Sequence, residues 1–98
     1  MARYLLLWNL DPARIPVDPK ERAAGWSGLV GMVKQDLEKG ISKDWGANIG
    51  EGKGYCIVEG TEIEISILVQ QYSPYVRFET HPIMSVSQIE EMLKALSK

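Results

Sequence analysis

The feature that most constrains the fold is a short apolar run, GYCIVEG, at residues 54–60. A run of this length with a glycine at each end is typical of a buried strand. A second run, YLLLW at residues 4–8, is apolar on both of its alternating sides. Strands of that kind are usually covered on both faces of a sheet. The two runs therefore predict central strands, and the other segments are interpreted around them.

The first helix is predicted to begin after a proline-containing loop at residues 11–19. Asp18 suits the N-cap, Pro19 suits the first helical position, and Glu21 suits the contact back to the cap. Gly40 suits the C-terminal end of the helix. The predicted buried stripe recurs at helical spacing and consists of Ala23, Trp26, Val30, Val33 and Leu37.

Three glycines, Gly25, Gly28 and Gly31, lie inside this predicted helix. Each costs about 1 kcal/mol relative to alanine in a helix interior. Two interpretations are open: a weak or kinked helix, or close approach by another backbone or a ligand. We favour the weak helix, because no helix rule requires glycine at these positions.

A strand and a glycine-rich turn are predicted before the central run. Residues 42–49 carry Trp45, Ala47 and Ile49 at alternate positions, which is the pattern of a half-buried strand. Residues 50–54, GEGKG, then form a hairpin loop. This loop does not fit a phosphate-binding loop, because the lysine is followed by glycine and then by a strand instead of a helix.

Residues 61–72 fit either a strand or a helix. Isoleucine and valine alternate with other residues from 63 to 69, which favours a strand. Thr61 and Glu64 have the spacing of a capping box, and a helix-length connection between the flanking strands is needed, so we predict a helix. A strand is predicted at residues 76–80, ending at Pro82. A last helix is predicted with Ser87 and Glu90 as its capping box and Ile89, Met92, Leu93 and Leu96 as its apolar side.

The predicted order is strand, helix, strand, strand, helix, strand, helix. This is an α+β chain with a ferredoxin-like βαββαβ core and an extra C-terminal helix. A chain of 98 residues is expected to form a single domain, residues 1–98. A domain this small has little stability to spare, so pairing with a second copy is favoured.

The chain resembles a family of small prokaryotic proteins of unknown function that are built as dimeric α+β barrels. The resemblance rests on residues 4–8 and 54–59, on QQYS at 70–73 and on VRFETHPI at 76–83. It implies a helix at 61–72 and a homodimer whose two sheets face each other. The wider fold group includes cofactor-independent monooxygenases, small isomerases, haem enzymes and ligand-sensing domains. Fold analogy alone assigns none of these activities to the chain.

Composition and charge disfavour several classes of partner. The net charge is −2, and lysine and arginine are scattered without a basic stripe, so nucleic acid is not an expected partner. No apolar run is long enough to span a bilayer, and no signal-peptide pattern is present. Cys56 is the only cysteine, so no internal disulfide can form. We expect a cytoplasmic protein without a membrane partner.

Strand alternation divides the predicted sheet into two faces. The face expected under the helices consists of Leu5, Leu7, Cys56, Val58, Val76 and Phe78. The opposite face is expected to carry Tyr4, Leu6, Trp8, Tyr55, Ile57, Glu59, Arg77, Glu79 and His81. An exposed face that mixes aromatic and ionisable groups usually marks an interface or a pocket. The predicted ligand-binding residues are Tyr4, Trp8, Tyr55, Glu59, Arg77 and His81.

The ionisable residues of that face suggest limited chemistry. Glu59 and Arg77 are expected to pair, and such a pair is more often structural than catalytic. Glu79 and His81 share one strand face, but with only Glu59 as a third candidate ligand no metal site is predicted. No cofactor is identified from the residues.

Three functions remain open at this point. We favour a homodimer that binds a small molecule in a cleft between its sheet and the partner. The first alternative is a cofactor-independent enzyme, monooxygenase-like or isomerase-like, with Glu59 or His81 as acid or base. The second alternative is a purely structural or interaction dimer, whose apolar sheet face is filled by the partner.

Overall fold

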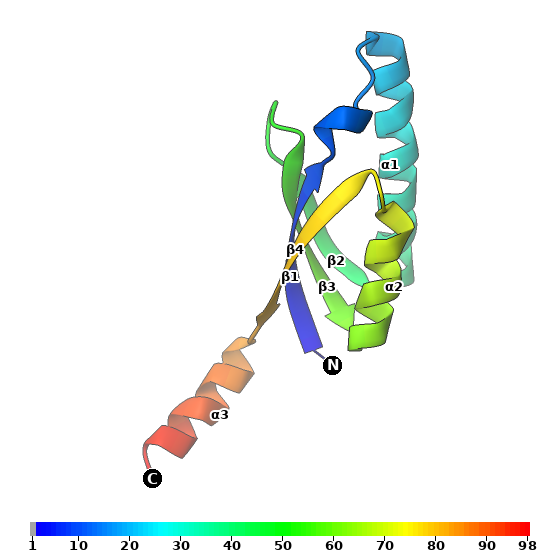
Figure 1. Cartoon of the computed structure of the whole chain (residues 1–98). Helices are drawn as coiled ribbons and strands as arrows, with labels where there is room; N and C mark the ends of the chain where they lie inside the picture. The colour runs from blue at the N-terminus through cyan, green and yellow to red at the C-terminus, as the bar shows by residue number, and fades with distance from the viewer. Residues whose placement is uncertain (1) are drawn as a thin grey trace.

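The computed structural model describes residues 2–98 and has the predicted α+β architecture (Figure 1). Its elements follow the βαββαβ order with an additional C-terminal helix. They are β1 (Ala2–Leu10), the 3-10 turn η1 (Pro12–Arg14), α1 (Pro19–Lys39), β2 (Ser42–Ala47), β3 (Lys53–Gly60), α2 (Glu62–Tyr72), β4 (Val76–Ile83) and α3 (Val86–Leu96). Among these elements, no helix is long and apolar enough to cross a membrane.

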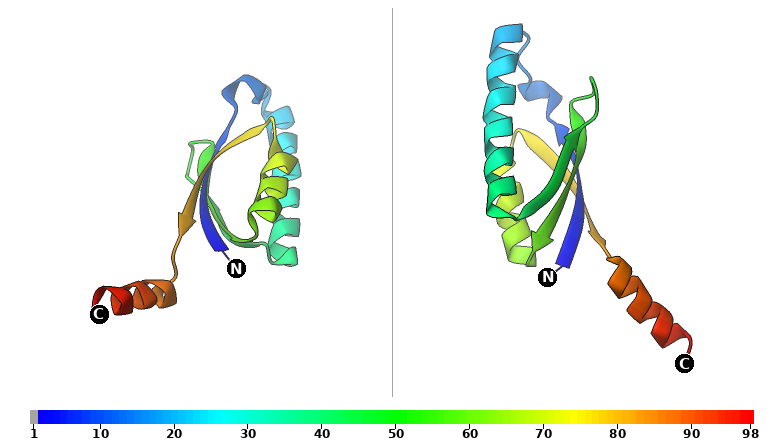
Figure 2. Two further views of the ribbon diagram at one scale, coloured as in Figure 1. Left: turned by 60° about the horizontal axis from the view of Figure 1, so that its bottom comes forward. Right: turned by 180° about the vertical axis from the view of Figure 1, so that it is seen from behind.

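The four strands form one antiparallel sheet in the order β2-β3-β1-β4. The two central strands are therefore β1 and β3, as the two apolar runs predict. Helices α1 and α2 lie side by side over one face of the sheet, and the other face is left open (Figures 1 and 2). We call this uncovered side the open face.

The hydrophobic core lies between the sheet and helices α1 and α2. Its buried apolar members are Leu6, Trp8, Val33, Cys56, Val58, Ile65, Leu68, Tyr72 and Val76. Trp8 is central to it, because its ring stacks on Trp45 at 5.2 Å and meets Trp26 edge-on at 6.3 Å. Gly54 lies directly opposite Trp8 on β3, where a Cβ atom would collide with the Gly46 carbonyl oxygen and the indole ring. The close packing of β2, β3 and Trp8 therefore requires this glycine.

The predicted orientation of β1 is wrong. Leu6 lies directly opposite Cys56, and residues that face each other across an antiparallel pair project from the same side of the sheet. Tyr4, Leu6 and Trp8 therefore lie on the helix-covered side, whereas Leu5 and Leu7 lie on the open face. The cause is that β1 is apolar on both sides, so its alternation alone cannot fix its orientation. The register with β3 decides it.

Helix α1 begins and ends as predicted. The Asp18 carboxylate accepts a hydrogen bond from the Glu21 amide, and Gly40 ends the helix at φ 82°. The buried stripe is rotated relative to the prediction, because Asp36 and the partly buried Leu29 face the sheet while Leu37 is 41% exposed. A pattern based on apolar residues misses a stripe that contains a buried carboxylate.

Helix α2 confirms the helical interpretation of residues 61–72. The Thr61 hydroxyl accepts from the Glu64 amide, and the Glu64 carboxylate accepts from the Thr61 amide, which completes the capping box. Ile65 and Leu68 are buried against the sheet, whereas Ile63 and Ile67 project outward. The alternation of β-branched residues thus reflects one buried side and one exposed side of a helix.

Three predicted boundaries need correction. Strand β2 stops at Ala47, and Ile49 is fully exposed in the turn that follows. Strand β4 continues through Pro82, which an edge strand tolerates because no further strand needs its missing N–H group. The capping box of α3 is formed by Ser85 and Gln88, two residues earlier than the predicted pair of Ser87 and Glu90.

Helix α3 projects away from the rest of the chain as a continuation of β4 (Figures 1 and 2). The chain is elongated in consequence, with a radius of gyration of 16.2 Å, compared with roughly 13 Å for a compact chain of this length. The large apolar side chains of α3 are all exposed and comprise Val86, Ile89, Met92, Leu93 and Leu96. The helix therefore has an uncovered apolar side.

Candidate functional site: the open face of the sheet

The open face has an apolar centre formed by Leu5, Leu7, Tyr55 and Ile57. Leu5 lies opposite Ile57 and Leu7 lies opposite Tyr55 across the two central strands. All four side chains are half-buried although no helix covers them. The rim is charged and contains Arg3, Asp44, Lys53, Glu59, Arg77, Glu79 and His81. An apolar centre inside a polar rim is the usual anatomy of an interface or a binding surface.

The rim residues are organised by contacts along the sheet. Arg3 and Glu59 form an ion pair at 3.3 Å, and the His81 Nε2 atom lies 3.5 Å from the Glu79 Oε1 atom. The Tyr55 hydroxyl donates a hydrogen bond of 2.8 Å to the Asp44 carboxylate. This hydrogen bond raises the pKa of Tyr55, so the phenol remains a neutral donor.

Gly46 explains how Tyr55 reaches Asp44. It lies directly opposite Tyr55 on β2, and a Cβ atom at this position would approach the tyrosine ring to 2.5 Å. The ring therefore crosses β2 over the glycine. A glycine inside a strand is a signal of close approach, but the sequence analysis did not use Gly46 and so missed this contact.

The six predicted ligand-binding residues do not lie together. Tyr55, Glu59, Arg77 and His81 belong to the open face. Tyr4 and Trp8 lie on the helix-covered side: Trp8 is 2% exposed in the core, and Tyr4 packs against the edge of that core. The physical reason is again the orientation of β1.

The predicted pairing of Glu59 with Arg77 is also wrong. Glu59 lies opposite Arg3 and Arg77 lies opposite Asn9, so the two are at opposite ends of β1. Six residues along a strand correspond to roughly 20 Å. Glu59 pairs with Arg3, and Arg77 pairs with Asp11 at 3.3 Å.

The catalytic candidates Glu59 and His81 lie on different strands, β3 and β4, with β1 between them. Adjacent strands are about 4.8 Å apart, so two spacings exceed the reach of a shared proton. Among residues 2–98, no three His, Cys, Asp or Glu side chains are grouped as metal ligands. In a single chain, Glu59 and His81 therefore cannot share a proton.

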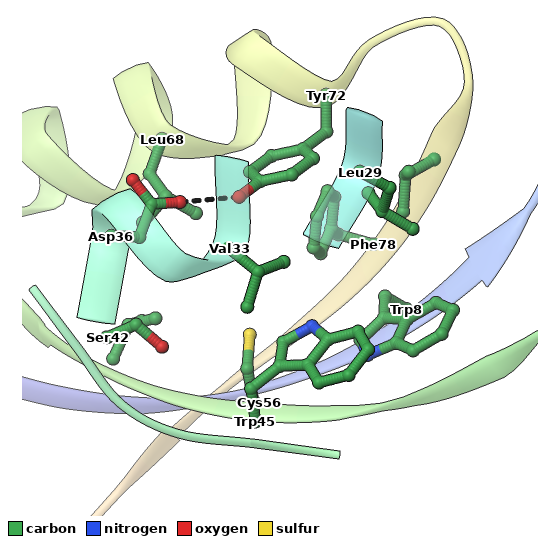
Figure 3. Close-up of a pocket in the computed structure, with 12 residues that line it drawn as sticks. Trp8, Leu29, Val33, Asp36, Ser42, Trp45, Cys56, Leu68, Tyr72 and Phe78 are labelled. Carbon is green, nitrogen blue, oxygen red and sulfur yellow. Dashed lines mark hydrogen bonds between the residues drawn. The ribbon is translucent and has the colours of Figure 1, made fainter. Parts of the chain in front are cut away.

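A second polar cluster lies inside the molecule, between the sheet and the helices (Figure 3). The Tyr72 hydroxyl donates a hydrogen bond of 2.5 Å to the buried Asp36 carboxylate. The buried Ser42 hydroxyl has no hydrogen-bond partner among residues 2–98 and borders the same cavity of about 20 Å³. A cavity of this size has room for about one water molecule.

The Cys56 thiol and the Tyr72 phenol of this interior cluster are not activated for chemistry. Burial raises the pKa of Cys56 to about 12, with a smaller effect from Asp36, so the thiol is protonated. Burial and the hydrogen bond to Asp36 also raise the pKa of Tyr72. Sequence reasoning placed Cys56 correctly under the helices but missed Asp36. The available signal was its position three residues after Val33, on the buried side of α1.

A family model described as Domain of unknown function (DUF3303) matches residues 3–97 of the chain. No curated protein matches the chain.

Proposed function

The chain belongs to the DUF3303 family, and we propose that it acts as a homodimer in which the open faces of two copies enclose a small molecule. The observation that carries this proposal is the half-buried apolar centre of Leu5, Leu7, Tyr55 and Ile57, uncovered and surrounded by charge. Soluble monomers rarely leave a contiguous apolar patch on a sheet without a partner for it.

The charges of the rim support pairing with a second copy. The rim carries acidic Asp44, Glu59 and Glu79 and basic Arg3, Lys53 and Arg77. In a twofold dimer the same patch meets itself, so a surface with both signs of charge can be complementary to its own copy. A surface of one sign would repel its copy.

Helix α3 supports the same arrangement. It continues from β4, which borders the open face, and its exposed apolar side lacks a cover within the chain. A helix that leaves the body in this way reaches a second copy packed on the open face. A face-to-face dimer with two such helices is expected to bury roughly 2,000 Å² or more.

The interior cavity beside Asp36 is too small for a ligand, so we place the ligand of the proposed dimer on the open face. The cavity beside Asp36 measures about 20 Å³, which has room for about one water molecule and for no larger ligand. The open face offers an apolar floor with the Tyr55 hydroxyl, the Glu59 carboxylate and the His81 imidazole at its edges. This combination suits a molecule with an apolar body and a few hydrogen-bonding groups.

A purely structural dimer is the second candidate. It is favoured by the contacts of the rim, where Arg3 pairs with Glu59 and Tyr55 with Asp44. Polar groups that already pair with one another need no hydrogen bonds from a ligand. An interface built on them would be filled by side chains of the two copies, without space for a ligand or water.

Native mass spectrometry of the purified full chain tests the proposal. The expected spectrum contains a dimer of twice the 11.0 kDa chain mass, with an additional non-covalent mass that disappears on denaturation. A dimer without additional mass, after incubation with a library of small metabolites, would leave the structural dimer as the function. A monomer at micromolar concentration contradicts both.

A further inference from the structure

A separate cavity of about 130 Å³ lies on the helix-covered side, at the end of β1, away from the open face. It is partly open to solvent and is lined by residues from η1, the first half of α1 and the start of β4. The start of α1 lies at the upper end of the molecule in Figure 1. Its floor is apolar and includes Leu10, Trp26, Leu29 and Val76. Leu29 and Val76 also border the interior cavity, so they form the inner end of this one.

Two arginines, Arg14 and Arg22, also line this cavity. Arg14 lies 3.5 Å from the Asp11 carboxylate and over the Tyr75 ring, but Asp11 is shared with a further arginine outside the cavity. Arg22 donates hydrogen bonds to the backbone carbonyls of Pro16 and Val17. Within residues 2–98 it has no carboxylate partner, so positive charge exceeds negative charge at the cavity.

Gly25 contributes open space to this cavity. It lines the cavity, and apart from its chain neighbours and the backbone of its own helix, no protein atom lies within 4 Å of a Cβ atom at this position. The packing of the protein therefore does not require glycine here, although glycine weakens a helix interior by about 1 kcal/mol relative to alanine. A larger side chain at position 25 would project into the cavity, so glycine keeps this space open.

We propose that this cavity binds a small monocarboxylate with an apolar body about the size of a benzene ring. The size follows from the volume, since an engineered apolar cavity of about 150 Å³ in another protein accepts benzene. The apolar body would lie against Trp26 and Leu29, and the carboxylate would lie between Arg14 and Arg22. Arginine suits this role because its planar group matches a carboxylate in charge and geometry. The proposal does not depend on dimerisation.

The test is an NMR titration of the full-length chain with benzoate, following the indole N–H signal of Trp26. Benzyl alcohol provides a similar body without the charge, and inorganic phosphate provides the charge without the body. We expect a saturable shift with benzoate and affinities at least about tenfold weaker for the other two probes. Gly25→Val is expected to weaken benzoate binding at least about tenfold, because its side chain fills the cavity.

Gly28→Val is the matched control. It lies on the same helix, also has no protein atom outside its own helix within 4 Å of an added Cβ, and does not line the cavity. It should therefore bind benzoate as the wild-type chain does. Arg14→Met should weaken benzoate but leave benzyl alcohol unchanged. The proposal is overturned by the absence of a saturable benzoate shift at millimolar concentrations, by equal benzoate affinity of the two valine variants, or by phosphate binding as tightly as benzoate.

Discussion

Replacing Tyr72 with Phe should destabilise the chain far more than the loss of one hydroxyl suggests. The Tyr72 hydroxyl is the hydrogen-bond donor to the Asp36 carboxylate, and both residues are 6% exposed. Its removal leaves a buried charged acceptor unsatisfied, which costs about 3 kcal/mol. In a chain of this size, that loss lowers the melting temperature by roughly 12 °C or more.

Tyr55→Phe is the matched control for this prediction. Tyr55 also donates its hydroxyl proton to an aspartate, Asp44, but this pair is exposed to solvent. In the single chain water can replace the lost donor, so the expected cost is below about 1 kcal/mol when unfolding is measured at a protein concentration low enough to keep the chain monomeric. The same substitution in the same type of pair thus isolates the effect of burial.

The assay is urea unfolding followed by circular dichroism, at one fixed protein concentration because dimerisation would contribute to the apparent stability. Asp36→Leu combined with Tyr72→Phe should recover part of the loss, since an apolar pair leaves no unsatisfied group. The reasoning is refuted if Tyr72→Phe costs no more than Tyr55→Phe, or if the double variant is less stable than Tyr72→Phe alone.

Two further predictions concern single ionisable groups. Cys56 should resist iodoacetamide at about pH 8 in the folded chain and react after unfolding. The reason is that burial raises its pKa to about 12, whereas the thiolate is the reactive form. Rapid modification of the folded chain would contradict the buried position of Cys56. The hydrogen bond that the Thr61 amide donates to the Glu64 carboxylate, with a smaller effect from the Thr61 side chain, lowers the pKa of Glu64 below its ordinary value of 4.5. The stability advantage of the wild type over Glu64→Gln should therefore be complete above pH 4.5 and disappear as pH falls through the lower pKa of Glu64 in the folded chain. Thermal melts at several pH values measure this advantage. An advantage that persists in acid would be inconsistent with the lowered pKa.

The parts of the fold that were predictable from sequence are those fixed by local signals. The capping box of Thr61 and Glu64 identified α2 against a competing strand pattern. Asp18 and Gly40 marked both ends of α1. These signals act within one turn of the chain, so their physical cause is visible in a short stretch of sequence.

The parts that were not predictable depend on contacts between distant segments. The orientation of β1 follows from its register with β3, and that register brings Leu6 opposite Cys56 across 50 positions of sequence. Asp36 is buried because Tyr72, from another helix, satisfies it. Of the six predicted ligand-binding residues, the four on β3 and β4 consequently lie on the open face, and the two on β1 do not.

The predicted α3 illustrates a different limit. Its apolar side was recognised from spacing, but the sequence did not indicate what covers it. In the structure that side is exposed. In the proposed dimer a second copy would cover this side, and no local pattern in one chain indicates such a contact.

The most direct test of the proposed dimer is light scattering of the full chain at micromolar concentration, with two arginine substitutions compared. Leu7→Arg places a charge in the apolar centre of the open face, and Ile67→Arg places one on the exposed side of α2, which is 57% exposed in the wild type. We expect a mass of twice 11.0 kDa for the wild type and for Ile67→Arg, and a mass of 11.0 kDa for Leu7→Arg with its helical signal retained. A wild-type monomer, or a dimer that Ile67→Arg dissociates and Leu7→Arg does not, would contradict association through the open face.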